Sequence, residues 1–172
     1  MKYVVLFFLS LNTYSVDICD IDFINKNAKS KELVAQYEEQ IASLGKVLYA
    51  RKASDCSIIK ELANKDDHIL IDARGMAVKG KIRGALRLTS DHDNPAGHKF
   101  KETVFEDTVN KYIKKRGRKG LAKDSNYVIF CNGATCYRTL HAACTLNKRG
   151  YKPSQLNLIL DGYDGLHFGC KI

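Results

Sequence analysis

The chain has 172 residues, of which 45% are hydrophobic, and its formal net charge is +9. This length gives one domain a sizeable core but is too short for two, and the composition excludes a disordered chain. Such a positive charge raises nucleic acid as a partner. However, the basic cluster over 111–119 belongs to no recognisable nucleic-acid module and suits the C-terminal end of a helix. We therefore expect no nucleic-acid partner.

The first residues are typical of a secretory signal peptide. Lys2 precedes the apolar run 4–9, and small residues near Ser15 follow it. The run is too short to span a bilayer, so we predict a signal peptide over 1–15, a periplasmic or secreted protein and no stable membrane insertion. A buried N-terminal strand is the alternative reading of the same run.

The next segment predicts a helix, a strand and a second helix. Apolar residues recur at helical spacing over 30–44 and stop before Gly45, which is a common helix terminator. A short strand is expected over 47–49, and Ser54 or Asp55 is expected to cap the helix that follows.

The remaining elements alternate between strands and helices. Strands are expected over 68–72, 84–88, 127–130 and 156–160, and helices over 100–113 and 136–148. The segment 89–99 is polar and reads as a loop. This alternation predicts an α/β fold, an open parallel sheet with helices on both faces. We assign residues 16–53 to an N-terminal extension and residues 54–172 to the domain.

Six cysteines follow the predicted cleavage site: Cys19, Cys56, Cys131, Cys136, Cys144 and Cys170. An even number in an exported protein permits disulfides, although the spacing does not fix their pairing. Because chain termini often lie close together, Cys19 and Cys170 are one candidate pair. Cys144 is expected in the core, and Cys56 in a structural or disulfide role. The chain has no CxxC motif, and we expect neither a metal nor a cofactor.

Cys131 is the strongest candidate for chemistry. It follows the apolar strand 127–130 and opens a short loop containing Gly133, after which a helix begins. Ligand sites of open α/β sheets lie at the carboxyl ends of strands, where loop N–H groups and a helix N-terminus favour an anion. A cysteine there is expected to have a lowered pKa and to react as a thiolate. The competing interpretation is an inert buried cysteine.

Three segments resemble rhodanese-like sulfurtransferase domains. Residues 127–151, YVIFCNGATCYRTLHAACTLNKRGY, are similar to the family's active-site region. Residues 69–88, ILIDARGMAVKGKIRGALRL, resemble its opening signature, and residues 160–167, LDGYDGLH, resemble its closing segment more weakly. The signature positions matched in the opening segment are Asp72, Arg74, Gly80, Lys81, Ile82, Gly84 and Ala85. The three matches occur in the family's order.

The resemblance implies a rhodanese-like fold and a persulfide mechanism. Cys131 would take sulfane sulfur from thiosulfate or a similar small anionic donor and pass it to a thiol or cyanide acceptor. The loop residues implied to bind the donor are Asn132, Gly133, Ala134, Thr135, Cys136, Tyr137 and Arg138. Arg138 would orient the donor, while Asp72 and Arg74 would brace the loop.

The chain also departs from the family pattern. Its loop is about two residues longer than in common members, so Arg138 falls seven positions after Cys131. Lys81 stands where a histidine is usual, and His167 where a tryptophan is usual. The longer loop is closest to that of an exported subset of the family with a second cysteine, here Cys136.

Two other functions fit Cys131. Cys136 lies five residues later and would form a disulfide with it in an oxidising compartment, which favours a redox or non-catalytic binding module. A cysteine-based phosphatase is the other alternative, although the spacing to Arg138 is too long and no aspartate is obviously placed as general acid.

Overall fold

A computed structural model describes most of the chain. The described residues are 17–20, 37–74, 82–87, 102–133, 136 and 138–172. The predicted signal peptide and the predicted loop over 89–99 lie outside these ranges, as do Gly80 and Lys81 of the opening signature.

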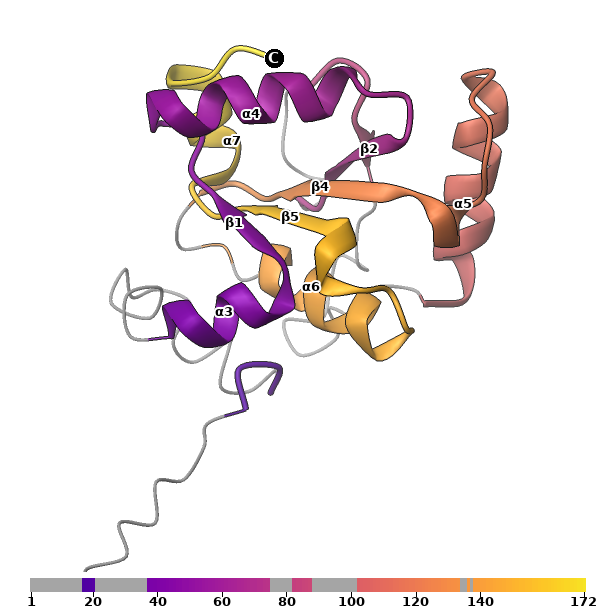
Figure 1. The fold of residues 1–172 in the computed structure, drawn as a ribbon, viewed down its shortest axis with the longest axis horizontal. Coiled ribbons are helices and arrows are strands. Elements are labelled where there is room, and N and C mark those ends of the chain that lie inside the picture. The colour runs from indigo at the N-terminus through magenta and orange to yellow at the C-terminus, as the bar shows by residue number, and fades with distance from the viewer. Residues whose placement is uncertain (1–16, 21–36, 75–81, 88–101, 134–135, 137) are drawn as a thin grey trace, which may run out of the picture.

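The strands form one five-stranded parallel sheet (Figure 1). They are β1 (Lys46–Leu48), β2 (His68–Asp72), β3 (Leu86–Arg87), β4 (Asn126–Phe130) and β5 (Leu156–Ile159). Their order across the sheet is β1-β5-β4-β2-β3. The predicted open parallel α/β sheet is therefore confirmed.

The middle of the sheet is its most apolar part. Strand β2 is buried along its whole length, and Tyr127 to Phe130 of β4 are fully buried. Parallel strands that are covered on both faces have continuous apolar sequences. The sequence therefore predicts the bounds of these two strands to within one residue. The same burial fixes the end of β4, where Cys131 begins the next loop.

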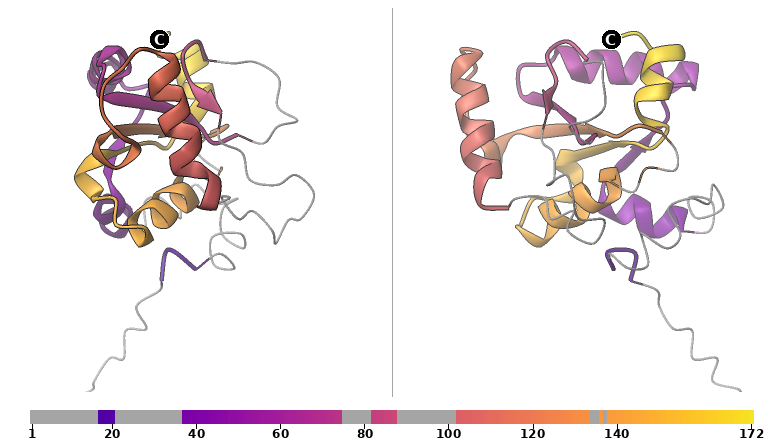
Figure 2. Two further views of the ribbon diagram at one scale, coloured as in Figure 1. Left: turned by 90° about the vertical axis from the view of Figure 1, so that its right-hand side faces the viewer. Right: turned by 180° about the vertical axis from the view of Figure 1, so that it is seen from behind.

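Helices cover both faces of the sheet (Figures 1 and 2). The helices are α3 (Glu38–Leu44), α4 (Ala53–Asn64), α5 (Glu102–Lys115), α6 (Arg138–Lys148) and α7 (Gly162–Phe168). Helices α4 and α7 contribute to the core on one face. Helices α3, α5 and α6 contribute to the core on the other. Two short 3-10 turns, Ala122–Asp124 and Pro153–Gln155, precede β4 and β5.

Some boundaries differ from the predicted ones. Helix α4 begins after Lys52, so Ser54 and Asp55 lie in its first turn rather than at its cap. The Asp55 carboxylate instead accepts a hydrogen bond from the Tyr49 N–H at 2.9 Å. Helix α6 begins at Arg138, two residues after the predicted start at Cys136.

The segment before residue 54 is built into the same layers. Strand β1 pairs with β5, and Ile41 and Leu44 of α3 are buried in the core beside α6. The Asn147 side chain of α6 also donates a hydrogen bond to the Leu44 carbonyl at 3.1 Å. Helix α3 thus packs on the sheet rather than extending away from it. Within the described residues, no helix is both long enough and apolar enough to cross a membrane.

Two disulfides fasten the faces of the sheet. Cys19 is bonded to Cys144 of α6 on one face, and Cys56 of α4 to Cys170 on the other. The suggested pair of Cys19 with Cys170 is therefore wrong, because the two termini reach opposite faces. Cys144 is buried in the core, as expected, and is also bonded.

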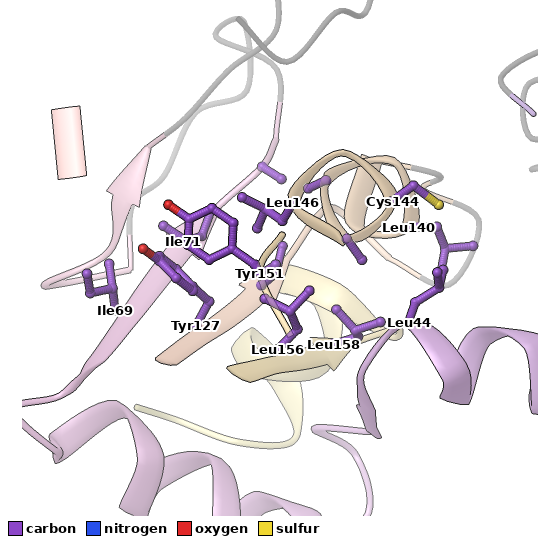
Figure 3. Close-up of a cluster of buried hydrophobic side chains, with 14 of the residues drawn as sticks. Leu44, Ile69, Ile71, Tyr127, Leu140, Cys144, Leu146, Tyr151, Leu156 and Leu158 are labelled. Atoms are coloured by element: carbon purple, nitrogen blue, oxygen red, sulfur yellow. The ribbon is translucent and has the colours of Figure 1, made fainter. Parts of the chain in front are cut away.

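A cluster of aromatic rings fills the core near the start of β4 (Figure 3). The rings of Tyr127 and Tyr151 meet edge to face with centroids 5.6 Å apart, and each also packs against Phe105. Burial raises the pKa of both phenols, that of Tyr151 to about 12. The folded protein therefore favours the neutral form of both rings.

This tyrosine cluster predicts a loss of stability at alkaline pH. The phenol of Tyr151 has an ordinary pKa of 10.0 and a folded pKa of about 12, so its stabilisation is complete below the first value and is lost toward the second. The urea midpoint should fall between pH ~10 and pH ~12, and this slope should be shallower in Tyr151→Phe. An equal slope in both proteins would contradict the assignment.

Candidate active site at the carboxyl ends of the strands

Cys131 lies directly after the central strand β4, at the carboxyl edge of the sheet. The Ala73 N–H, which follows β2, donates to the Phe130 carbonyl at 2.9 Å, so the ends of β2 and β4 stay paired beside Cys131. Only 1% of Cys131 is exposed. Open α/β sheets generally bind their ligands at this edge.

The turn between β5 and α7 holds the Cys131 loop from the other side. The Tyr163 N–H donates to the Cys131 carbonyl at 2.6 Å, and the Asp164 N–H donates to the Asn132 carbonyl at 3.0 Å. Asp161, at the start of this turn, accepts hydrogen bonds from the backbone N–H groups of Ala50 and Arg51, both at 2.8 Å. The loop is therefore held by a turn that is itself bonded to the residues following β1.

Cys131 and Cys136 form a disulfide, with their Cα atoms 5.9 Å apart. The Cys136 N–H also donates to the Gly133 carbonyl at 2.9 Å. Cys136 is half-buried, whereas Cys131 is almost fully buried. The structure thus holds the oxidised pair that the redox interpretation required, and a disulfide carries no nucleophilic thiolate.

The predicted loop residues are only partly described. Asn132 and Gly133 are half-buried, and Arg138 opens α6 with its side chain half-buried. Ala134, Thr135 and Tyr137 lie outside the described residues. The anion cradle predicted for the loop N–H groups thus stays a prediction, and the Cys136 N–H already donates to the Gly133 carbonyl.

Asp72 and Arg74 form a buried ion pair at the end of β2. Nε and Nη2 of Arg74 donate to the two carboxylate oxygens of Asp72 at 2.9 and 2.8 Å, and the Arg74 backbone N–H donates at 3.1 Å. Arg87 of β3 adds a second guanidinium, with Nε and Nη2 both 3.2 Å from the same carboxylate. Two guanidinium groups therefore converge on one carboxylate at the strand ends.

Arg74 connects this cluster to the turn that clamps the loop. Its guanidinium lies 3.9 Å from the centroid of the Tyr163 ring and 5.7 Å from that of Phe130. The His167 ring stacks on Tyr163 with centroids 5.4 Å apart. Arg74 therefore touches side chains from the residue before Cys131 and from the residue that hydrogen-bonds to it.

Sequence reasoning did not single out Arg87 or Tyr163. Arg87 occupies an edge strand far from Cys131 in sequence, and only the strand order brings it to Asp72. Tyr163 lies in the closing segment, for which the sequence predicts no helix. Gly162 and Gly165 lower the helix propensity of this segment, so its sequence does not predict helix α7. The first turn of α7 nevertheless supplies both N–H groups that bond to the Cys131 loop.

The glycine before Tyr163 is required by this clamp. Gly162 has a φ of 57°, and a Cβ atom there would come within 2.5 Å of the Cys131 carbonyl oxygen and 2.7 Å of the Gly133 nitrogen. Both the backbone conformation and the space therefore select glycine.

Gly162→Ala is expected to destabilise the protein by more than its backbone strain alone. Gly150→Ala is a matched control, because Gly150 also has a positive φ of 83° but has open space around its Cβ position. The control should cost roughly 1–2 kcal/mol, measured by urea unfolding, and Gly162→Ala clearly more. Equal losses in the two variants would mean that the turn does not press on the Cys131 loop.

A pocket of about 230 Å³ lies elsewhere, at the start of β2. Its lining includes His68 and the guanidinium groups of Arg83, Arg116 and Arg118. Arg118 donates to the His68 carbonyl at 2.6 Å, and Arg116 lies over the Tyr112 ring. These contacts give both arginines structural roles at the opposite edge of the sheet from Cys131. Among the described residues, no cluster of three or more His, Cys, Asp or Glu side chains is arranged to hold a metal ion.

Comparison with known proteins adds no assignment. No family model matches the chain, and no curated protein matches it. The site described above is therefore the basis for the functional argument.

Proposed function

We propose that the protein is a rhodanese-like sulfurtransferase whose reduced form carries sulfane sulfur as a persulfide on Cys131. The observation that carries this proposal is the position of Cys131. It follows the central strand of a parallel sheet and opens a loop that is hydrogen-bonded to the β5–α7 turn, beside a strand end that holds two guanidinium groups. A reactive thiol and an anionic donor are both favoured in such a place.

The reaction begins once the Cys131–Cys136 bond is reduced. The Cys131 thiolate attacks the outer sulfur of thiosulfate, forms a sulfur–sulfur bond and releases sulfite. The bond that breaks is the one between the two sulfur atoms of the donor. A thiol or cyanide acceptor then attacks the outer sulfur of the persulfide and regenerates the Cys131 thiolate, which completes a two-step covalent cycle.

Charge assists the binding of the donor. Thiosulfate and sulfite are dianions, and the guanidinium groups of Arg74 and Arg87 lie at the strand ends beside the loop. The chain as a whole also carries a formal charge of +9, which raises the local concentration of anions. Arg138 at the start of α6 is placed at the far end of the same loop.

The initial rate of sulfur transfer from thiosulfate to excess cyanide tests the proposal. The protein is first reduced and freed of reductant, and thiocyanate is then measured. Cys131→Ser should lose at least about a thousandfold of the rate, because the nucleophile is absent. Cys136→Ser should stay active and no longer need reduction, since its Cys131 has no partner in the loop.

Parallel assays separate the alternatives. Hydrolysis of para-nitrophenyl phosphate without thiocyanate formation would favour a phosphatase. Thiol–disulfide exchange by the wild type, with no thiocyanate from either the wild type or Cys136→Ser, would favour the redox module, to which the observed Cys131–Cys136 bond also belongs.

A further inference from the structure

The disulfide between Cys131 and Cys136 shows that the sulfur atom of Cys136 can reach that of Cys131. Their sulfur atoms are bonded, and their Cα atoms are 5.9 Å apart, within the usual range for a bridge. A persulfide on Cys131 would therefore form beside a second thiol. The proposed persulfide thus has a neighbour able to break it.

The loop is already held in the bridging conformation. The Cys131 carbonyl is fixed by the Tyr163 N–H, and the Asn132 carbonyl by the Asp164 N–H. The Cys136 N–H is in turn bonded to the Gly133 carbonyl, so both cysteines of the bridge have a backbone group held by hydrogen bonds. These bonds are made by backbone atoms, so neither sulfur atom takes part in them.

We propose that Cys136 is a resolving thiol that converts the Cys131 persulfide into free sulfide, an activity that rests on the proposed sulfurtransferase function. The Cys136 thiolate attacks the inner sulfur, which is Sγ of Cys131. The bond to the outer sulfur breaks, and that sulfur leaves with the bonding electrons as hydrosulfide. The two cysteines are oxidised to the observed disulfide, and the sulfane sulfur is reduced to sulfide.

A dithiol reductant closes the cycle. Cys136 is half-buried and Cys131 only 1% exposed, so an external thiolate reaches the Cys136 sulfur first. Attack there forms a mixed disulfide on Cys136 and releases Cys131 as the thiolate that the next donor requires. The second thiol of the reductant then frees Cys136. The net reaction converts one thiosulfate and one dithiol into one sulfite, one hydrogen sulfide and one disulfide.

A single-turnover experiment tests this inference. Reduced protein freed of reductant is mixed with one equivalent of thiosulfate, and sulfite and sulfide are both measured. The wild type should release one equivalent of each and regain the Cys131–Cys136 bond, found by peptide mapping. Cys136→Ser should release the sulfite but at least about tenfold less sulfide, because its persulfide has no resolving thiol in the loop.

The two readouts separate the inference from the function on which it rests. Sulfite release with a lasting persulfide in the wild type, or equal sulfide from the wild type and Cys136→Ser, would overturn the resolving role alone. Absence of sulfite from both proteins would overturn the sulfurtransferase function and the inference with it. Cys136→Ser keeps the four other cysteines, so it also reports any sulfide that those thiols release. Peptide mapping of the Cys131–Cys136 bond uses the wild type alone, so this readout does not depend on how any variant folds.

Discussion

Asp72→Asn is expected to lower the free energy of unfolding by about 3–5 kcal/mol, since it breaks a buried ion pair on one side only. Asp72 is 2% exposed and Arg74 is fully buried. The asparagine keeps the shape of the side chain but removes the charge that compensates Arg74 and Arg87. Because Arg74 also packs on Tyr163, the loss should spread to the turn that clamps Cys131.

Urea unfolding of the oxidised protein measures this effect, and Asp66→Asn is its matched control. The Asp66 carboxylate is 96% exposed and lies 3.8 Å from Arg118, so its loss should change stability by no more than about 1 kcal/mol. Similar values for Asp72→Asn and Asp66→Asn would show that the strand-end cluster does not hold the site together.

Removing the Cys56–Cys170 disulfide is expected to cost about 5 kcal/mol, because the bond restricts a long loop in the unfolded chain. The two cysteines are 114 residues apart in sequence. The bond also fixes the end of α7 to α4, since Cys170 is fully buried between them. The double variant Cys56→Ala/Cys170→Ala tests this by urea unfolding under non-reducing conditions.

The bond in the active-site loop provides the comparison. Cys131 and Cys136 are 5 residues apart, so Cys136→Ala should cost only about 2 kcal/mol on the same chain-entropy basis. Equal losses from the two disulfides, or a larger loss in the loop, would contradict a structural role for the first and a chemical role for the second.

The central strands were predictable because burial on both faces leaves a simple signal. The run His68–Asp72 was identified at its true boundaries, and the run ending at Phe130 was one residue short at its start. Such apolar runs bounded by polar residues need no tertiary information. The parallel α/β fold then follows from the alternation with helices.

The disulfide pairing and the last helix were harder to predict from the sequence. Which cysteines pair depends on which face of the sheet each one reaches, and that follows from the strand order rather than from spacing. The suggested Cys19–Cys170 pair failed for this reason. Helix α7 contains Gly162 and Gly165, which have low helix propensity, and it is held by hydrogen bonds to the Cys131 loop.

The residues of the candidate site also divide into those that the sequence predicted and those that only the structure revealed. Cys131 was singled out because it directly follows a recognisable strand, whereas Asp72 and Arg74 were singled out by the resemblance of residues 69–88 to a family signature. Arg87 and Tyr163 come from an edge strand and from a glycine-rich turn, and they join the site only through the packing around Arg74 and Asp72. Local sequence identifies residues at strand ends, whereas the neighbours that complete the site are set by topology.

The central claim is that Cys131 accepts sulfane sulfur, and the intact mass of Cys136→Ser after incubation with thiosulfate tests it most directly. This variant lacks the proposed resolving thiol, so the persulfide should accumulate. We predict a gain of one sulfur atom, located on Cys131 by peptide mapping and absent from Cys131→Ser treated in the same way. An unchanged mass in Cys136→Ser, or the same gain in Cys131→Ser, would contradict the account.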